Sequence, residues 1–273
     1  MKGDRPGTAA GSLRILTWNV QSASPVRSRA QVAWLASQEH ADTVVLTEVG
    51  AGPGGTALVQ ALSGAGYRGL ISPASRGDYR TVLATRLPHL TSLPSPVVFL
   101  PHRAPAARLT IGAHTVTLVG LYVPSRGPRE RRNEDKRAFQ ASVAATLRQL
   151  AEETGRHLVF VAGDLNVVEP GHRPHHAVFG AWEYDFYRAF AAAGFTDAYR
   201  HLNPDVVEHS WFGRTGNGYR FDHTFITSRH RHLLTACSYL HDPRQEGLSD
   251  HAAMTVRAAL CGSEPADSRV SGR

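Results

Sequence analysis

Short apolar runs rich in β-branched residues recur along most of the chain, separated by longer segments in which apolar positions repeat with a helical period. Each run is short and is bounded by Gly, Pro or polar residues, which is typical of buried strands. The predicted strands cover residues 13–20, 43–47, 81–85, 97–100, 108–111, 114–121, 158–162, 224–227, 233–240 and 252–258.

The segments with helical periodicity predict helices at residues 27–40, 56–62, 130–153 and 182–193. In the longest of them, Phe139, Val143, Leu147 and Leu150 are spaced by four, four and three residues, which places them on one helical face. The first helix separates two strands, so the chain begins as a β-α-β unit with those strands side by side. The order of elements predicts an α/β fold.

Polar side chains follow several predicted strands at the point where each strand ends. Asn19 and Glu48 follow the first two strands, and Tyr122 follows the strand 114–121. Asp164 and Asn166 come just after the strand 158–162, and this Gly-Asp-Leu-Asn sequence alone is equally typical of a turn. Because α/β folds place their chemistry at the carboxyl ends of strands, we expect these side chains to converge on one site. A carboxylate beside an amide suits phosphoester cleavage.

Three further polar residues, Asp222, Asp250 and His251, precede predicted strands near the end of the chain. Glu48 and Asp250 are the hard oxygen ligands that Mg²⁺ takes in proteins, and Asn19 would support them. His251, adjacent to Asp250, acts as a general base or as a donor to phosphate once its second ring nitrogen is held. Asp222 is the candidate to hold it.

Other chemistry receives less support from the sequence. His172, His175 and His176 lie together in the segment 171–176, but without regular metal-ligand spacing, so we interpret this segment as a solvated loop. No GxSxG or P-loop motif occurs. The two cysteines, Cys237 and Cys261, are too few for a disulfide framework and are expected to be packing residues.

Composition supports one domain at residues 13–259, between flexible ends at 1–12 and 260–273. With 42% hydrophobic and 19% charged residues the chain can bury a sizeable core, and no apolar run is long enough to span a membrane. The start of the chain lacks the apolar core of a secretory signal. We expect a cytoplasmic, monomeric protein with no membrane partner.

The formal net charge of +7 permits binding to a polyanion. Only Lys2 and Lys136 are lysines, so the basic charge is almost entirely arginine. A GC-rich genome explains this composition as well as a nucleic-acid-binding surface does, and charge alone leaves both interpretations open.

The candidate site residues lie in six sequence blocks whose order resembles the endonuclease/exonuclease/phosphatase superfamily of metal-dependent phosphoesterases. The blocks are WNV, LTEV, LYVPS, GDLNVV, YRFDHTFIT and SDHA. Within the superfamily the chain is most similar to the exonuclease III and apurinic/apyrimidinic endonuclease branch, over residues 13–258. The resemblance implies a four-layer α/β sandwich of two facing, mostly antiparallel or mixed sheets flanked by helices, with the site at one end.

The resemblance also implies roles for the site residues. Glu48 would be a metal ligand with Asn19 and Asp250 nearby, and Tyr122 and Asn166 would contact the scissile phosphate. Asp222 and His251 would form a pair, and the base that activates water would be either Asp164 or His251. Substrate would be bound by Arg220 and by three aromatic residues that match a pocket for a base-free sugar, Trp211, Tyr219 and Phe221. Burial of these aromatic residues under a loop is the alternative interpretation.

The function expected from the resemblance is hydrolysis of DNA by a phosphodiesterase that depends on Mg²⁺, with Mn²⁺ as the alternative ion. The enzyme would be an exonuclease III-like 3′-5′ exonuclease or apurinic/apyrimidinic endonuclease of DNA repair, acting on double-stranded DNA that is damaged or has 3′ ends. One alternative is a phosphoesterase acting on a small phosphorylated metabolite or a lipid headgroup. The other is a non-catalytic nucleic-acid-binding module.

Overall fold

The computed structural model describes residues 11–39, 41–75, 77–126, 130–153 and 157–260. Most of the two ends that we expected to be flexible lies outside the described residues, as does Cys261. None of the helices in the described residues is long and apolar enough to cross a bilayer.

The first of two six-stranded sheets has the strand order β13-β14-β1-β2-β4-β3. Its strands are β1 (Ser12–Asn19), β2 (Thr43–Val49), β3 (Gly69–Ile71), β4 (Arg80–Thr85), β13 (Leu234–Leu240) and β14 (Ala253–Ala259). β1 and β2 are parallel because helix α1 (Pro25–Ser37) connects them, as the β-α-β pattern predicted, and the other neighbours pair antiparallel.

The second six-stranded sheet has the order β5-β6-β7-β8-β12-β9. Its strands are β5 (Leu90–Leu93), β6 (Ala106–Ile111), β7 (His114–Tyr122), β8 (Leu158–Asp164), β9 (Phe195–Asp197) and β12 (Asp222–Thr227). Here the parallel pair is β7 and β8, joined by the long helix α3 (Glu130–Glu153). The mixed character expected for both sheets is confirmed.

The remaining elements are short or lie outside the two sheets. They are α2 (Pro53–Gly64), η1 (Pro101–Arg103), α4 (Ala181–Ala192), α5 (Ala198–Leu202), β10 (Trp211–Phe212), β11 (Gly218–Tyr219), η2 (Ser228–Leu233) and α6 (Asp242–Gln245). β10 and β11 form a small antiparallel pair of their own.

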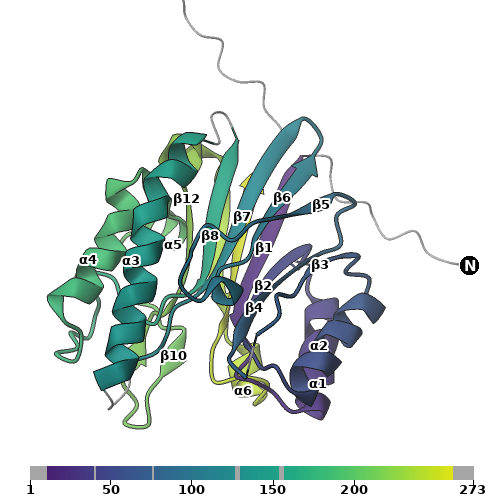
Figure 1. The fold of residues 1–273 in the computed structure, drawn as a ribbon, viewed down its shortest axis with the longest axis horizontal. Helices are drawn as coiled ribbons and strands as arrows, with labels where there is room; N and C mark the ends of the chain where they lie inside the picture. Colours follow the sequence, from purple (N-terminus) through teal and green to yellow (C-terminus); the bar gives the residue numbers. More distant parts are fainter. Residues whose placement is uncertain (1–10, 40, 76, 127–129, 154–156, 261–273) are drawn as a thin grey trace, which may run out of the picture.

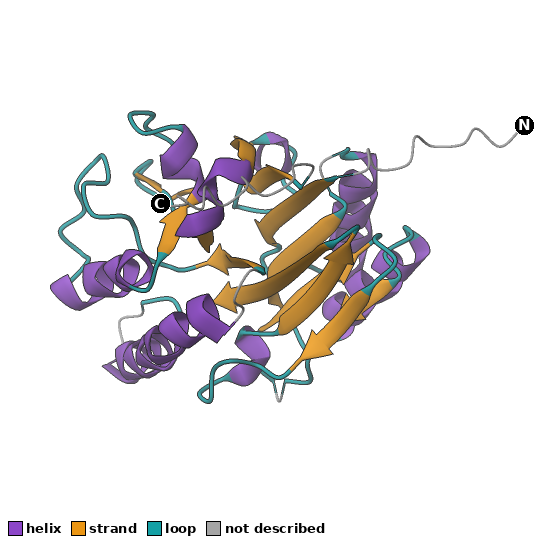
Figure 2. Ribbon diagram, turned by 90° about the horizontal axis from the view of Figure 1, so that it is seen from above, coloured by secondary structure: helices purple, strands orange, loops and turns teal. Residues whose placement is uncertain are grey.

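The sheets face each other across a shared apolar core and form the inner two of four layers. Ile15 and Val45 of the first sheet belong to the same buried cluster as Leu118 and Phe160 of the second. Helices α1 and α2 cover the outer face of the first sheet, and α3 and α4 cover the outer face of the second (Figure 1). Seen from above, the strands lie between helices on both flanks (Figure 2). The four-layer sandwich is therefore confirmed.

Strand register brings the polar strand ends together. In the parallel pair of β7 and β8, Tyr122 lies opposite Asp164, and in the antiparallel pair of β8 and β12 the same Asp164 lies opposite Asp222. Asn19 ends β1 directly beside Thr47 of β2. One edge of the sandwich therefore collects side chains from both sheets.

The predicted strand at residues 97–100 is wrong. This stretch forms bends that lead into η1, and the edge strand β5 lies upstream of it. Val97 is buried all the same, with 3% of its surface exposed. Pro94, Pro96 and Pro101 surround these apolar residues and cannot donate hydrogen bonds to a sheet ladder, so the segment packs without pairing.

Candidate active site

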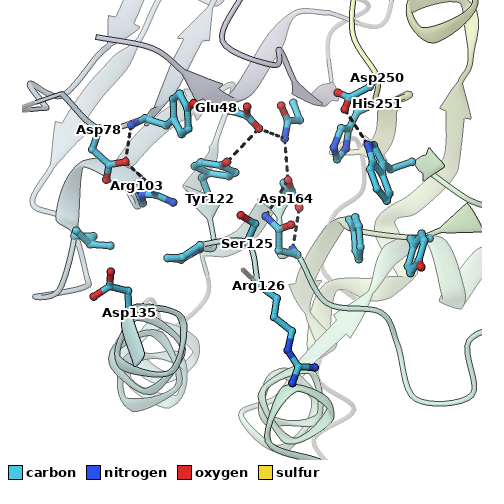
Figure 3. A pocket seen from close by; sticks show the side chains of 18 of the residues that line it. Glu48, Asp78, Arg103, Tyr122, Ser125, Arg126, Asp135, Asp164, Asp250 and His251 are labelled. Atoms are coloured by element: carbon cyan, nitrogen blue, oxygen red, sulfur yellow. Dashed lines mark hydrogen bonds and ion pairs between the residues drawn. The ribbon is translucent and has the colours of Figure 1, made fainter. Parts of the chain in front are cut away.

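A cavity of about 790 Å³ opens at the edge where the polar strand ends meet. Ten of the expected site residues line it: Asn19, Glu48, Tyr122, Asp164, Asn166, Trp211, Tyr219, Phe221, Asp250 and His251. Figure 3 shows Glu48, Tyr122 and Asp164 at its centre, drawn from both sheets. The fold therefore brings together most of the residues that the sequence singled out.

Unusual backbone conformations aim the central residues into this cavity. Glu48 has a φ of 56° and lies where the pairing of β2 with β4 shifts register between Leu46 and Val49. Asn166 has a φ of 48°, again in the left-handed region. Non-glycine residues in this region are strained, and such strain clusters at functional sites.

Gly163, the second-last residue of β8, lies very close to the backbone of β7. Its φ is 154°, and a Cβ atom placed on it would lie 1.8 Å from the carbonyl oxygen of Leu121 on the neighbouring strand. Only glycine permits this approach. The Gly-Asp-Leu-Asn segment is thus the end of β8 and the first two residues after it, and it brings Asp164 and Asn166 to the site.

Asn19 links the carboxylates of the two sheets. Its Nδ2 donates to Oε2 of Glu48 at 3.1 Å and to Oδ2 of Asp164 at 2.9 Å. Its Oδ1 accepts from the backbone N–H of Gln21 at 2.9 Å, which determines the orientation of the amide. Asn19 therefore presents N–H groups to both carboxylates, a geometry that suits the supporting role expected for it beside Glu48.

Tyr122 and Asn166 complete the central hydrogen bonds. The hydroxyl of Tyr122 donates to Oε2 of Glu48 at 3.1 Å, and burial, together with the charge of Glu48, holds the pKa of this phenol well above its usual value. Asn166 donates its backbone N–H to Oδ1 of Asp164 at 2.8 Å. Its side-chain amide donates to the carbonyl of Val123 at 2.9 Å. Tyr122 is thus a protonated donor at neutral pH.

Asp164 lies at the bottom of the cavity and is almost completely buried. Burial, reinforced by the charge of Asp222, raises the pKa of the Asp164 carboxyl from 3.8 to about 7. A carboxyl group with a pKa near neutrality can both accept and release a proton at physiological pH.

His251 and Asp222 form the pair that the sequence predicted. Nδ1 of His251 lies 2.7 Å from Oδ2 of Asp222, and Asp222 is fully buried behind the imidazole ring. Burial disfavours the charged imidazole, but the Asp222 carboxylate outweighs it and raises the pKa of His251 to about 9. His251 is therefore an imidazolium at neutral pH, with one nitrogen held by Asp222.

Glu48 and Asp250 fit the expected divalent cation. Among the described residues, Oδ1 of Asp250 is buried and accepts no hydrogen bond, while Oδ2 accepts from Nε1 of Trp211 at 2.9 Å. The described residues contain no cluster of three or more His, Cys, Asp or Glu side chains that could enclose a metal ion. Two carboxylates with an unpaired oxygen still suit Mg²⁺, which keeps several of its water ligands.

The aromatic residues form one wall of the cavity and are not buried under a loop. Trp211 of β10 lies opposite Tyr219 of β11, and Tyr219 stacks with Phe221 at a ring-centroid distance of 5.1 Å. All three are partly exposed where they line the cavity. Behind them, His176 stacks on Tyr219 at 3.9 Å.

The histidine segment differs from the solvated loop that we expected. His172 and His176 are buried, and only His175 is exposed. His172 Nε2 accepts from the backbone N–H of Arg220 at 3.1 Å, and His176 Nε2 donates to the carbonyl of Gly218 at 2.9 Å. The histidine loop supports the aromatic wall from behind. Its hydrogen-bond partners Arg220 and Gly218 lie more than forty residues further along the chain, so the local sequence gave no sign of this burial.

Arg220 does not line the cavity, in contrast to its expected role in substrate binding. Its side chain is fully buried and pairs with Glu169 at 2.5 Å and with Asp197 at 2.8 Å. A guanidinium enclosed by two carboxylates is not free to contact substrate. Its position between the aromatic residues Tyr219 and Phe221 fits a role in anchoring the wall.

The cavity extends beyond Tyr122 to residues that the sequence did not single out. Arg103 stacks over the Tyr122 ring at 4.6 Å and is held by two hydrogen bonds to Asp78, at 2.6 and 2.9 Å (Figure 3). Arg126 also lines this end and donates to Glu183 at 3.3 Å. Arg103 lies between Pro101 and Pro105. The sequence predicted no strand there, so it gave no sign that Arg103 is close to the other site residues.

The sequence of the chain matches one protein family over most of its length. Residues 16–251 match the Endonuclease/Exonuclease/phosphatase family. A DNA-(apurinic or apyrimidinic site) endonuclease of Dictyostelium discoideum is 25% identical over 246 residues, which cover 83% of this chain and 65% of that protein. The present chain thus spans less than two thirds of the length of this relative.

Solved structures share the fold. A 3′-5′ exonuclease from Neisseria meningitidis superposes with a TM-score of 0.73 at 22% identity, covering 90% of this chain and 100% of that chain. An AP endonuclease from Leishmania major gives a TM-score of 0.72 at 19% identity, covering 92% of this chain and 89% of the other. Since the family match includes every strand end that builds the site, the chain belongs to the endonuclease/exonuclease/phosphatase family.

Proposed function

We propose that the protein is a magnesium-dependent phosphodiesterase that hydrolyses DNA, either at abasic sites or from 3′ ends. The observation that carries this proposal is a single cavity that joins the linked carboxylates of Glu48 and Asp164, the Asp222–His251 pair and an aromatic wall. The names of the relatives, an apurinic or apyrimidinic endonuclease and a 3′-5′ exonuclease, support this class of reaction.

Donors around the cavity would hold the scissile phosphate. The imidazolium of His251 lines the cavity and would donate to a phosphoryl oxygen, because Asp222 keeps it charged and oriented. The Tyr122 hydroxyl also lines the cavity and would donate to the phosphate once its single proton turns away from Glu48. Asn166 donates its side-chain amide to Val123 at 2.9 Å and to Asp164 at 3.3 Å, and would contact the phosphate from beside Asp164 only by giving up one of these bonds. Such positioned donors stabilise the extra negative charge that develops during attack by water.

Asp164 is the better placed of the two candidates for the general base. His251 already carries a proton and is paired with Asp222, so it acts as a donor. Asp164 is oriented by Asn19 and Asn166 and is ready to take the proton of an attacking water molecule. A bound divalent cation held by Glu48 and Asp250 would supply Lewis-acid stabilisation of the phosphoryl oxygens.

The aromatic wall favours a substrate with an apolar, exposed face next to the phosphate. A deoxyribose that has lost its base offers such a face, and Trp211, Tyr219 and Phe221 present theirs to the same cavity. This match supports abasic DNA over a small phosphorylated metabolite or a lipid headgroup as substrate.

Cleavage of two matched duplexes tests the proposal. One duplex carries a single abasic-site analogue and the other is intact, and each is incubated with Mg²⁺ or with EDTA. Incision at the analogue that requires Mg²⁺ is expected. Absence of product from both duplexes, together with hydrolysis of small phosphoesters, would replace DNA by the alternative substrate class.

A further inference from the structure

The side chain of Trp211 contacts the cation site as well as the aromatic wall. Its Nε1–H donates to Oδ2 of Asp250 at 2.9 Å. The other oxygen of this carboxylate, Oδ1, is buried and accepts no hydrogen bond from the described residues. The indole therefore determines which of the two oxygens of Asp250 remains available.

The backbone around Trp211 is attached to the segment that carries Asp250. Trp211 and His251 form an isolated antiparallel bridge, and the N–H of Ala252 donates to the carbonyl of Ser210 at 2.8 Å. The indole also packs at ring-centroid distances of 5.4 Å from Tyr219 and 5.7 Å from Phe221. The position of the Nε1 donor relative to Asp250 is thus held by both backbone and side-chain contacts.

We propose that Trp211 is a positioning residue for the divalent cation, holding Asp250 through Oδ2 so that Oδ1 is presented to the ion. An aspartate side chain without this partner rotates about its own torsions and loses entropy when it binds the ion. A hydrogen bond from a neighbouring group removes that cost in advance, which is why such bonds to ligand side chains strengthen metal binding. The proposal rests on the proposed function only for the presence of a cation at Glu48 and Asp250.

Binding of Mn²⁺ by the full chain without DNA, measured by isothermal titration calorimetry, tests the proposal. Trp211→Phe keeps an aromatic ring but removes the N–H donor, and we expect it to weaken Mn²⁺ affinity by roughly 10-fold, as changes to such supporting groups do. Phe212→Leu is the matched control, because Phe212 is the neighbour of Trp211 on β10 but is 41% exposed and does not line the cavity. It should leave the affinity unchanged.

The outcomes separate the two proposals. Equal Mn²⁺ affinity in wild type and Trp211→Phe would overturn the positioning role. Asp250→Asn should greatly weaken the binding of Mn²⁺. If it does not, the cation does not bind at Asp250, and the metal site given in the proposed function is wrong. Thermal unfolding of each variant shows whether the comparison is made on folded protein.

A second measurement follows the Trp211 indole directly in the wild-type protein. Titration with Mg²⁺, which is diamagnetic, should shift the indole N–H resonance of Trp211 in a ¹⁵N NMR spectrum, with the resonance assigned by its loss in Trp211→Phe. An indole resonance that does not move while Mg²⁺ binds would contradict the contact between this donor and the cation ligand.

Discussion

The ammonium group of Lys136 lies 2.5 Å from the Glu183 carboxylate, and both side chains are completely buried. The same ammonium donates to the carbonyl oxygen of Asn166 at 2.8 Å, and Glu183 also accepts from the backbone N–H of Gly180 at the start of α4. One ion pair thereby joins α3, α4 and the left-handed turn that carries Asn166. Stability and the geometry of the active site depend on the same contact.

Replacing Lys136 by Met should destabilise the protein by up to about 3–5 kcal/mol, because it removes the buried cation that balances Glu183 and leaves only the partly exposed Arg126, at 3.3 Å, to pair with it. The free energy of unfolding from urea titration measures this. Arg188→Met is the matched control, since Arg188 and Asp185 form a pair with side chains 58% and 70% exposed. Its effect should stay below about 1 kcal/mol. Similar losses in the two variants would show that the buried pair has no special weight.

Asp164→Asn should reduce the rate of DNA cleavage by roughly 10²–10⁴-fold, the contribution typical of a general base. Glu48→Ala should abolish cleavage as well, because it removes a carboxylate from the cation site. Single-turnover cleavage of the abasic duplex measures both effects, and circular dichroism shows whether the fold is kept. Either variant retaining near-normal activity at saturating Mg²⁺ would refute the role given to that residue.

Phe221→Ala should lower the preference for abasic over intact duplex, since it removes one face of the aromatic wall while leaving Asp164 and His251 in place. The ratio of kcat/KM for the two duplexes measures the preference. Phe212 offers a matched control, because it lies on β10 beside Trp211 but is 41% exposed and does not line the cavity. A preference that survives in Phe221→Ala would mean that the wall does not select the sugar.

Acidification should weaken the protein through His172. Burial lowers the pKa of this imidazole from 6.5 to about 4, and its Nε2 must stay unprotonated to accept the N–H of Arg220. Because the folded pKa is depressed, the contribution of His172 to stability is complete above 6.5 and is lost as the pH falls through about 4. Urea unfolding across this range should show a steeper loss of stability in wild type than in His172→Gln.

The corresponding control uses His175 of the same loop, which is exposed. His175→Gln should leave the pH dependence of stability as in wild type. Identical pH profiles for His172→Gln and wild type would indicate that another group is responsible for the acid sensitivity.

Local patterning of apolar and polar residues determined the fold and most of the candidate site. Apolar runs and helical periods are properties of neighbouring residues, and α/β folds place their chemistry at the carboxyl ends of strands, so Asn19, Glu48 and Asp164 were expected to meet. The prediction of a strand at 97–100 was wrong for a reason that is also local. The prolines on either side of this apolar stretch disfavour pairing in a sheet.

Tertiary structure alone decided how the polar side chains are oriented and which of them are free. The side chain of Asn19 donates to Asp164, which lies 145 residues further along the chain, and the indole of Trp211 donates to Asp250, 39 residues further along. Arg220 was expected to bind substrate, but Glu169 and Asp197 enclose it. The hydrogen-bond partners, burial and pKa of a side chain depend on groups that are distant in sequence. They therefore cannot be predicted from the pattern of neighbouring residues.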